Sequence, residues 1–372
     1  MPTAYSAGND RASDAKARPA LRIGSFAIDP PVLLAPMSGV TDPPFRRLAR
    51  RLGAPAVVSE MIASREALRE SRVTLNRLKA ERDERPRIVQ LAGHDPAAVA
   101  EAVRFCLDLG ADAIDLNFGC PAKKVTNKEC GSALMREPDR AAAIMEAAVE
   151  AAAPHGAPVT AKMRTGWAAD ARNAPEIARR AEAVGIAALT VHGRTRDQKY
   201  AGAADWRFIR EVKQAVSIPV TANGDVVDAA SLDACLAQSG ADAVMIGRGA
   251  YGRPWIVGQA AQYMRTGRWP DDPPPSVVAD LTIEHYEAML SHYGRHRGLR
   301  HARKHLSWSL KAARDRDGRG LPGAAALRDR LMREEDPAAV IRLLREAFAR
   351  LEGAGAPDRR GDVDRLGARE AA

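Results

Sequence analysis

Eight short apolar runs, separated by stretches with helical spacing, are the feature that most limits what this 372-residue chain can fold into. The runs are continuous rather than alternating, which is typical of strands buried on both faces of a parallel sheet. They cover residues 32–35, 56–59, 87–91, 113–117, 158–163, 187–192, 218–222 and 243–247. Eight strand–helix repeats with right-handed crossovers close most simply into an α/β fold, the (β/α)8 TIM barrel. A doubly wound open sheet is the alternative.

The sequence changes character after about residue 267. Residues 269–275 read WPDDPPP, which is typical of a linker. Helical patterns without a strand signal follow and predict a smaller C-terminal all-α domain. We therefore expect a disordered leader, a barrel, a helical domain and a disordered tail. Their expected ranges are 1–20, 21–268, 276–352 and 353–372.

Charge and cysteine content narrow the class of partner and the compartment. The chain carries a net charge of +9, and residues 288–313 contain Lys and Arg but no Asp or Glu. Acids normally interrupt a solvated basic face, so this segment favours an anionic partner, for which RNA is the natural candidate. Four cysteines without a CxxC pair indicate a reducing cytoplasm rather than a disulfide scaffold. No apolar run is long enough to span a bilayer, so we expect no membrane association.

Polar or glycyl residues follow nearly every expected strand, where a barrel builds its active site. Two such segments, NGD at 223–225 and GRG at 247–249, follow strands seven and eight, where barrels commonly bind phosphate. Glycines let backbone N–H groups approach an anion, and Arg248 can supply a charged fork. Two ordinary βα turns are the plainer interpretation. Because both loops carry the signal, we favour phosphate binding.

Lys162 and His192 come from strands five and six and point to the same end of the barrel. A lysine flanked by apolar residues inside a strand needs an anionic or electron-rich partner. Such a lysine forms a Schiff base, pairs with an electron-rich cofactor ring, or makes a structural salt bridge, here with Asp115. No second His or Cys stands at metal spacing near His192. We expect no ligation by the pair His301 and His305 on a basic helix, and therefore no metal site.

Cys120 lies in the loop after strand four, just before a proline. Loop placement exposes it, and Lys123 and Lys124 would favour its thiolate. We expect chemistry from Cys120, whereas Cys106 and Cys235 fall within helical patterns and fit a buried, inert role. The neighbouring Cys130 stays open between the two interpretations.

Ten stretches together resemble one known family. They are LAPMSGVTDPPFR (34–46), VSEM (58–61), VQLAG (89–93), DLNFGCPAKKV (115–125), GSAL (131–134), KMRTGW (162–167), TVHGRTR (190–196), IPVTANGD (218–225), MIGRGAYGRPW (245–255) and RKHLSW (303–308). The chain resembles the tRNA-dihydrouridine synthases, and is most similar to their bacterial B-type subgroup. The resemblance covers about residues 30–310, and NxGCPxxK with a later HGRTR is its most specific part.

The resemblance implies FMN as cofactor and NADPH as reductant. It places the flavin ring on one group of side chains and the ribityl phosphate on another. The ring group is Pro36, Met37, Ser38, Gln90, Lys162 and His192. The ribityl and phosphate group is Asn223, Gly224, Asp225, Gly247 and Arg248.

The resemblance further implies reduction of the C5–C6 bond of uridine in the D-loop of tRNA, with Cys120 as general acid. Asn117 and Arg194 are the expected readers of the uracil edge. The residues expected to contact the RNA are Lys123, Lys124, Arg303 and Lys304. Two alternatives remain: an FMN barrel acting on a free pyrimidine, like dihydroorotate dehydrogenase, and a non-catalytic RNA-binding barrel. No obligate protein partner is expected.

Overall fold

The computed structural model describes residues 18–67, 85–315 and 317–353. The described chain divides into two compact units. The first runs to Ala250 and includes Pro254–Pro270, and the second comprises Tyr251–Arg253 and the chain from Asp271. The leader expected over 1–20 and the tail expected over 353–372 lie almost entirely outside the described residues.

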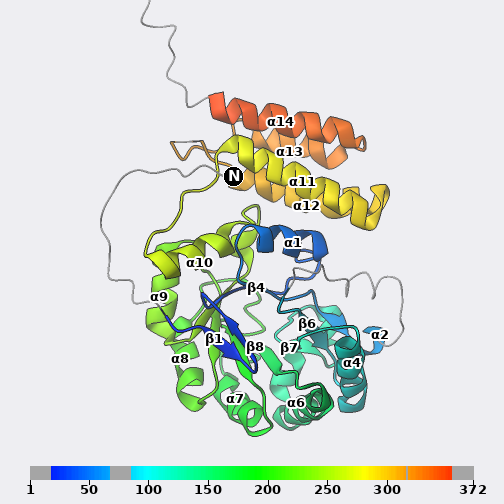
Figure 1. The fold of residues 1–372 in the computed structure, drawn as a ribbon, viewed down its shortest axis with the longest axis vertical. Coiled ribbons are helices and arrows are strands. Elements are labelled where there is room, and N and C mark those ends of the chain that lie inside the picture. Colours follow the sequence, from blue (N-terminus) through cyan, green and yellow to red (C-terminus); the bar gives the residue numbers. More distant parts are fainter. Residues whose placement is uncertain (1–17, 68–84, 316, 354–372) are drawn as a thin grey trace, which may run out of the picture. The chain divides into compact units, whose positions relative to one another are not determined.

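A closed parallel sheet forms the centre of the first unit (Figure 1). Its ladder order is β4-β3-β11-β10-β9-β8-β7-β6-β5. The segments β4 and β5 are two halves of the second barrel strand. A parallel bridge from Val58 to Ile88 joins this strand to β6 and closes the barrel. The nine segments therefore form eight barrel strands, and the expected (β/α)8 barrel is confirmed. The bounds are β3 (Val32–Leu34), β4 (Ala56–Val57), β5 (Ile62–Ala63), β6 (Ile88–Ala92), β7 (Ala113–Phe118), β8 (Val159–Arg164), β9 (Ala188–His192), β10 (Val220–Asn223) and β11 (Ala243–Ile246).

Helices follow the strands and lie outside the sheet (Figure 1). Several begin at an aspartate whose side chain accepts a hydrogen bond from a backbone N–H of the first turn, as Asp42 does for α1 and Asp228 for α9. The bounds are α1 (Pro43–Arg51), α2 (Ser64–Ala67), α4 (Pro96–Asp108), α5 (Lys123–Thr126), α6 (Pro138–Ala152), α7 (Ala174–Ala183), α8 (Trp206–Ala215), α9 (Ala229–Ser239) and α10 (Ile256–Thr266). The short 3-10 helices are η1 (Gly131–Arg136), η2 (Ala153–His155) and η3 (Arg248–Ala250).

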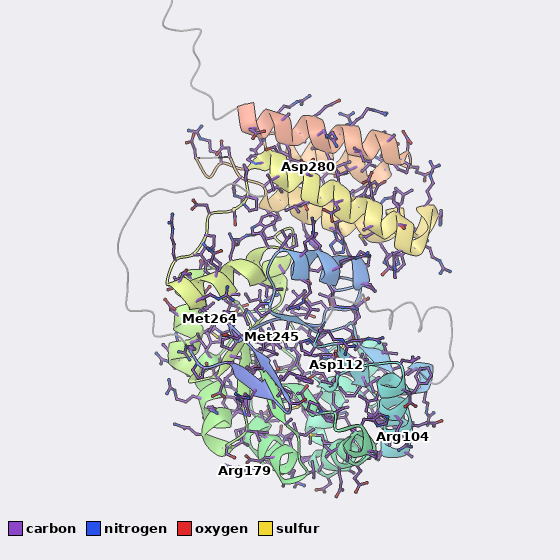
Figure 2. All side chains as sticks on the ribbon, viewed as in Figure 1. Arg104, Asp112, Arg179, Met245, Met264 and Asp280 are labelled. Atoms are coloured by element: carbon purple, nitrogen blue, oxygen red, sulfur yellow. The ribbon has the colours of Figure 1, made fainter. Side chains whose placement is uncertain are left out.

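The barrel wall separates two apolar cores. On β7, for example, Ile114 and Leu116 pack outward with the helices, whereas Ala113 belongs to the inner cluster. Met245, labelled within the barrel in Figure 2, is also in that inner cluster. Because side chains alternate along a strand, residues 115 and 117 follow Ala113 on the inner face.

A hairpin that the sequence analysis missed packs against the amino ends of the barrel strands. Its strands β1 (Leu21–Ile23) and β2 (Phe26–Ile28) are antiparallel, and their buried side chains join the inner cluster. Alanines are the first residues of β4, β7, β9 and β11 and belong to the same cluster. Their small side chains leave room for the hairpin, so the polar inner positions lie toward the opposite, carboxyl end of the strands.

The second unit is helical. Its helices are α11 (Pro275–Tyr293), α12 (Arg295–Ala312), α13 (Ala324–Arg333) and α14 (Pro337–Gly353). Leu299, Leu306 and Leu310 form a buried stripe along α12, which leaves Arg300 exposed. Across the three described stretches of chain, no helix combines the length and apolar character needed to cross a bilayer.

Candidate active site

Polar side chains occupy the inner positions toward the carboxyl ends of the barrel strands and form one hydrogen-bonded layer. Gln90 on β6 donates to Asp115 on β7 (Nε2–Oδ2 2.7 Å), and Thr160 on β8 donates to the other oxygen of the same carboxylate (Oγ1–Oδ1 2.7 Å). Burial raises the pKa of Asp115, while these two hydrogen bonds and the charge of Lys162 act in the opposite direction. Apolar packing gives way here to hydrogen bonding, as expected where a barrel carries its chemistry.

Cys120 stands on a loop that is fixed from both sides. The side-chain oxygen of Asn117 accepts hydrogen bonds from the backbone N–H groups of Gly119 (3.1 Å) and Cys120 (2.9 Å). The carbonyl of Cys120 accepts two more from Ser132, one from the backbone N–H (3.1 Å) and one from the hydroxyl (2.9 Å). The backbone around a partly exposed thiol is therefore held in place.

Two cations of β8 respond electrostatically to Cys120. Its charge acts to raise the pKa of Lys162 and of Arg164, although burial dominates and lowers the pKa of both. Arg164 also donates from Nε to the carbonyl of Gly119, the residue before Cys120 (2.7 Å). A cation from β8 therefore holds the backbone of the cysteine loop.

Lys162 is held by an amide rather than by a carboxylate. Its Nζ donates to Oδ1 of Asn223 (3.0 Å), and Nδ2 of Asn223 donates to the carbonyl of Met245 (2.8 Å). Burial and the nearby charge of Arg164 lower the pKa of Lys162 to about 8, against the opposing influence of Asp115. Its hydrogen-bond partner is thus Asn223, and the structural salt bridge with Asp115, which the sequence left open, is not the contact observed.

The loops after β9, β10 and β11 meet around Asp225. This carboxylate accepts from Arg194 (Nη2–Oδ2 2.6 Å) and from Arg248 (Nη2–Oδ1 3.1 Å). Burial alone would raise the pKa of Asp225, but the hydrogen bond and charge of Arg194 hold this pKa below its usual range. Arg248 remains exposed, so its guanidinium can still reach an anion at the mouth.

His192 is neutral in this setting. Burial, followed by the charges of Lys162 and Arg164, lowers its pKa well below the ordinary value. Gly224 lies against it with φ of 125°, and a Cβ there would stand 3.1 Å from Cδ2 of His192 and 2.7 Å from Cβ of Ala204. Only glycine fits this position.

We expect the substitution Gly224→Ala to lower the free energy of unfolding by about 2–4 kcal/mol, since it combines an unfavourable φ with a clash. Gly156→Ala is the control, because Gly156 also has a positive φ (61°) but nothing within 4 Å of an added Cβ. Urea unfolding of both variants measures the difference. Equal losses of unfolding free energy in the two variants would show that the clash with residues 192 and 204 contributes nothing.

Most of the residues expected at the site meet at the mouth. Pro36, Met37 and Ser38 are partly or fully exposed there. A Cβ on Gly247 would lie 3.7 Å from the sulfur of Met37 and 3.9 Å from Nδ2 of Asn223, so loops after strands one, seven and eight converge.

Four expected residues lie away from the open mouth. Gln90 is 1% exposed and its amide is engaged by neighbours. Arg194 is 2% exposed and donates to the carbonyls of Ala201 and Gly202 as well as to Asp225. Both therefore face protein rather than the open mouth. Arg303 and Lys304 belong to α12 of the second unit, where both are partly buried.

Of the two loop lysines, Lys123 is exposed, and the side chain of Lys124 lies outside the described part of the structure. Both are the first residues of the short helix α5, which follows Cys120 in the chain.

Two site features escaped the sequence analysis. The buried carboxylate of Glu60 accepts a hydrogen bond from the backbone N–H of Gly39 and so orders the loop after β3. Tyr200 is 55% exposed, and its ring lies 5.8 Å from the guanidinium of Arg164 and 5.0 Å from that of Arg248. The sequence signal that could have identified Tyr200 was an aromatic residue in the polar loop that follows HGRTR. Within the described residues, no group of His, Cys, Asp or Glu is arranged to hold a metal ion.

The fold and the polar mouth define the class of (β/α)8-barrel enzymes, whose chemistry takes place at the carboxyl ends of the strands. A family profile described as Dihydrouridine synthase (Dus) matches residues 33–352. A probable tRNA-dihydrouridine synthase of Rhodobacter capsulatus is 51% identical over 90% of this chain and 99% of its own length. The tRNA-dihydrouridine synthase B of Xanthomonas axonopodis pv. citri is 46% identical over 92% of this chain and 100% of its own. The chain belongs to the dihydrouridine synthase family of enzymes.

Solved structures support the fold over the barrel. A morphinone reductase mutant in complex with tetrahydroNAD is similar with a TM-score of 0.51 at 14% identity, covering 70% of this chain and 93% of its own. A 2-naphthoyl-CoA reductase is similar with a TM-score of 0.53 at 12% identity, covering 71% and 53% respectively. At these identities the similarity establishes the barrel architecture alone.

Proposed function

We propose that this enzyme reduces uridine to 5,6-dihydrouridine in the D-loop of tRNA, with FMN as cofactor, NADPH as reductant and Cys120 as the proton donor to C5. The observation that carries the proposal is the position of Cys120, whose loop is fixed by the side chains of Asn117 and Ser132 and by Arg164 of β8. The names of the relatives supply the substrate class. An enzyme acting on tRNA with NADPH belongs in the cytoplasm.

The residues at the mouth fit a flavin nucleotide. The ammonium of Lys162 donates to one amide oxygen and has further protons for an electron-rich ring. The exposed guanidinium of Arg248, beside glycines at 247 and 249, suits the ribityl phosphate. Neutral His192 can donate or accept without adding charge. When bound, the flavin supplies the hydride that C6 of the uracil receives.

Cys120 supplies the matching proton. The C5–C6 bond of uracil is conjugated with the C4 carbonyl, so hydride addition at C6 leaves negative charge over C5 and O4. Transfer of the thiol proton to C5 completes the C–H bond and leaves a thiolate. The thiolate then takes a proton from water, which the partial exposure of the side chain permits.

The structure suggests different roles for three of the expected substrate and cofactor residues. Because Gln90 and Arg194 are buried and hydrogen-bonded within the protein, we assign them to positioning rather than to direct contact with flavin or uracil. Asn117 uses its side-chain oxygen on the Cys120 loop, which leaves it little capacity to read a base.

The second unit is the proposed tRNA-binding domain. Helix α12 presents exposed Arg300 and Lys311 together with the partly buried Arg303 and Lys304. Phosphate contacts from such a face supply affinity without sequence specificity. These phosphate contacts would offset the cost of extruding a uridine from folded RNA, which is on the order of a few kcal/mol. Lys123 and Lys124, on the loop of Cys120, would then meet phosphates near the extruded base.

The test is direct. The purified protein should show the yellow absorbance of a bound flavin, and with NADPH it should form dihydrouridine in tRNA from a strain that lacks the gene. A colourless protein unable to bind FMN would remove the flavoenzyme proposal and favour the non-catalytic barrel. Flavin turnover with a free pyrimidine but not with tRNA would favour the dihydroorotate dehydrogenase-like alternative.

A further inference from the structure

Two arginines and a tryptophan meet on the loops beside Cys120, and the proposed chemistry uses none of them. Arg136 ends η1, Trp167 lies in the loop after β8, and Arg196 lies in the loop after β9. The guanidinium carbon of Arg136 lies 4.1 Å from the centre of the Trp167 ring, and that of Arg196 lies 4.4 Å from it. The helix η1 also supplies Ser132, which holds the carbonyl of Cys120. The cluster therefore lies on the carboxyl-end loops that carry the active site.

Backbone contacts fix the loops that present this cluster. The backbone N–H of Arg196 donates to the carbonyl of Gly166 (3.0 Å), which ties the loop after β9 to the loop after β8. The backbone N–H of Trp167 donates to the carbonyl of Ala171 (3.1 Å) and closes a tight turn. A Cβ on Gly166 would stand 2.1 Å from the carbonyl oxygen of Ala171, so this turn requires glycine. The Trp167 ring is thus held in place before any ligand arrives.

The two guanidinium groups keep their charge available. No described residue places a carboxylate at ion-pair distance from Arg136 or Arg196. The neighbouring carboxylate of Asp197 instead accepts from the hydroxyl of Thr195 and from the backbone N–H of Gln198 (2.8 Å). Arg136 is exposed, and nothing in the described part of the chain accepts from the buried Nε of Arg196. Positive charge of this kind at the mouth favours an anion from outside the chain.

The tryptophan explains how two like charges are held close together. A guanidinium group over an indole ring is stabilised by cation–π attraction and keeps N–H groups for other acceptors. An arginine that is held in this way loses less side-chain freedom when it binds, and its N–H groups match phosphate oxygens in pairs. Both guanidinium carbons lie within 4.4 Å of one ring centre, so the pair fits one phosphate group or two consecutive ones.

We infer that Arg136 and Arg196, held by Trp167, bind backbone phosphate of the RNA strand that flanks the extruded uridine. The inference rests on the proposed function, because a base that enters the mouth leaves its own phosphates at the loops around it. The cluster offers guanidinium donors and no group that distinguishes one base from another, which suits contact with the backbone. It adds an anchor on the barrel unit to the phosphate contacts proposed for α12.

The salt dependence of tRNA binding tests the inference without any turnover. The probe is an unmodified tRNA transcript, whose dissociation constant is measured by fluorescence anisotropy from about 50 to 200 mM KCl. Arg136→Gln and Arg196→Gln should each weaken binding about 5- to 20-fold. Each should also reduce the slope of log Kd against log salt by about 0.7, the value for one phosphate contact on a single strand. Trp167→Leu keeps both charges, so it should weaken binding about 2- to 5-fold with little change in slope.

Arg104→Gln is the matched control for the loss of one positive charge. Arg104 is an exposed residue of α4, outside the sheet (Figure 2). We expect its dissociation constant to stay within about twofold of the wild-type value, because exposed charges far from the bound phosphates are screened by salt.

Phosphate alkylation locates the contact on the RNA. The transcript is treated sparingly with ethylnitrosourea, and the ethylated phosphates that prevent binding are mapped. With the wild-type protein these should include phosphates next to the uridine that the enzyme reduces. This interference should be lost selectively in Arg136→Gln and Arg196→Gln, whereas interference elsewhere on the tRNA should remain.

The reductive half-reaction separates RNA from NADPH, which also carries phosphate. Rapid mixing of the oxidised protein with NADPH should show the same concentration dependence in the wild type and in both arginine variants. Weaker NADPH binding in the variants, together with unchanged tRNA binding, would overturn the inference and assign the cluster to the reductant.

Wild-type affinity and salt slope in both arginine variants, or an equal loss in Arg104→Gln, would overturn the inference and leave the proposed function intact. A wild-type protein that neither binds tRNA nor reduces its uridines would remove the proposed function, and this inference with it. Arg136 is exposed, so Arg136→Gln still decides should Arg196→Gln fail to fold.

Discussion

The variant Cys120→Ala should bind FMN normally and lose about a thousandfold of its tRNA-dependent turnover. General acid catalysis by a positioned side chain contributes about 10²–10⁴ in rate, and no other thiol is available at this point of the loop. FMN retention is expected because alanine keeps the backbone hydrogen bonds that fix this loop. Single-turnover reoxidation of the reduced protein by tRNA measures the loss.

Cys130→Ala is the matched control for this experiment. Cys130 lies on the same loop, but its sulfur lies near His94 (3.9 Å) and donates to the carbonyl of Lys128 (3.2 Å). Burial also raises the pKa of its thiol. We expect turnover close to that of the wild type. Comparable losses in both variants would show that the loop, rather than the Cys120 thiol, limits the reaction.

The second large effect concerns Lys162. Replacing it by methionine should weaken FMN binding by about 10- to 100-fold, since a charge-assisted hydrogen bond contributes about 1.5–3 kcal/mol. The same substitution should stabilise the flavin-free protein at neutral pH, because burial makes the ammonium unfavourable there. An upward shift of about 5 °C in the unfolding midpoint is the expected size.

The pH dependence of that stabilisation has a definite sign. The pKa of Lys162 is about 8 in the folded chain and 10.5 for an ordinary lysine. Below pH 8 both states hold the proton, and the folded state bears the full penalty of the buried charge. Between about pH 8 and 10.5 the folded state releases the proton first, and the penalty disappears. The advantage of Lys162→Met should therefore shrink over this range.

Lys213→Met provides the control, because Lys213 pairs with Asp242 on the surface at 2.7 Å. Surface ion pairs contribute little, so the difference between its unfolding midpoint and that of the wild type should stay nearly constant with pH. A Lys162→Met protein that is less stable than the wild type at pH 7, or that retains FMN fully, would contradict this account of the buried ammonium.

The barrel could be predicted from the sequence because burial on both faces leaves a continuous apolar run for each strand. Strand positions such as Lys162 and His192 could be assigned to the mouth for the same reason, since a strand end fixes where its side chains lie. The apolar pattern did not indicate that the second barrel strand is divided into β4 and β5. The N-terminal hairpin was missed because its two strands have three residues each.

The partners of the site residues could not be predicted. Arg194 looks like an exposed reader in the motif HGRTR, yet the loop folds back and buries its guanidinium against Asp225 and two carbonyls. Gln90 and Asn117 are far apart in the chain, and only the register of β6 on β7 brings their amides together. Motifs identify residue types at a strand end, whereas hydrogen-bond direction requires the pairing of strands.

The proposal requires the Cys120 thiol and the bound flavin to stand on opposite faces of the uracil, so that the proton reaches C5 from the side opposite to the hydride at C6. Protein reduced chemically in D2O and mixed with tRNA should add deuterium at both C5 and C6, and NMR of the released nucleoside gives their relative configuration. The account predicts that the two deuterium atoms lie on opposite faces of the ring. Deuterium atoms on the same face, or addition at C6 followed by random configuration at C5, would contradict it.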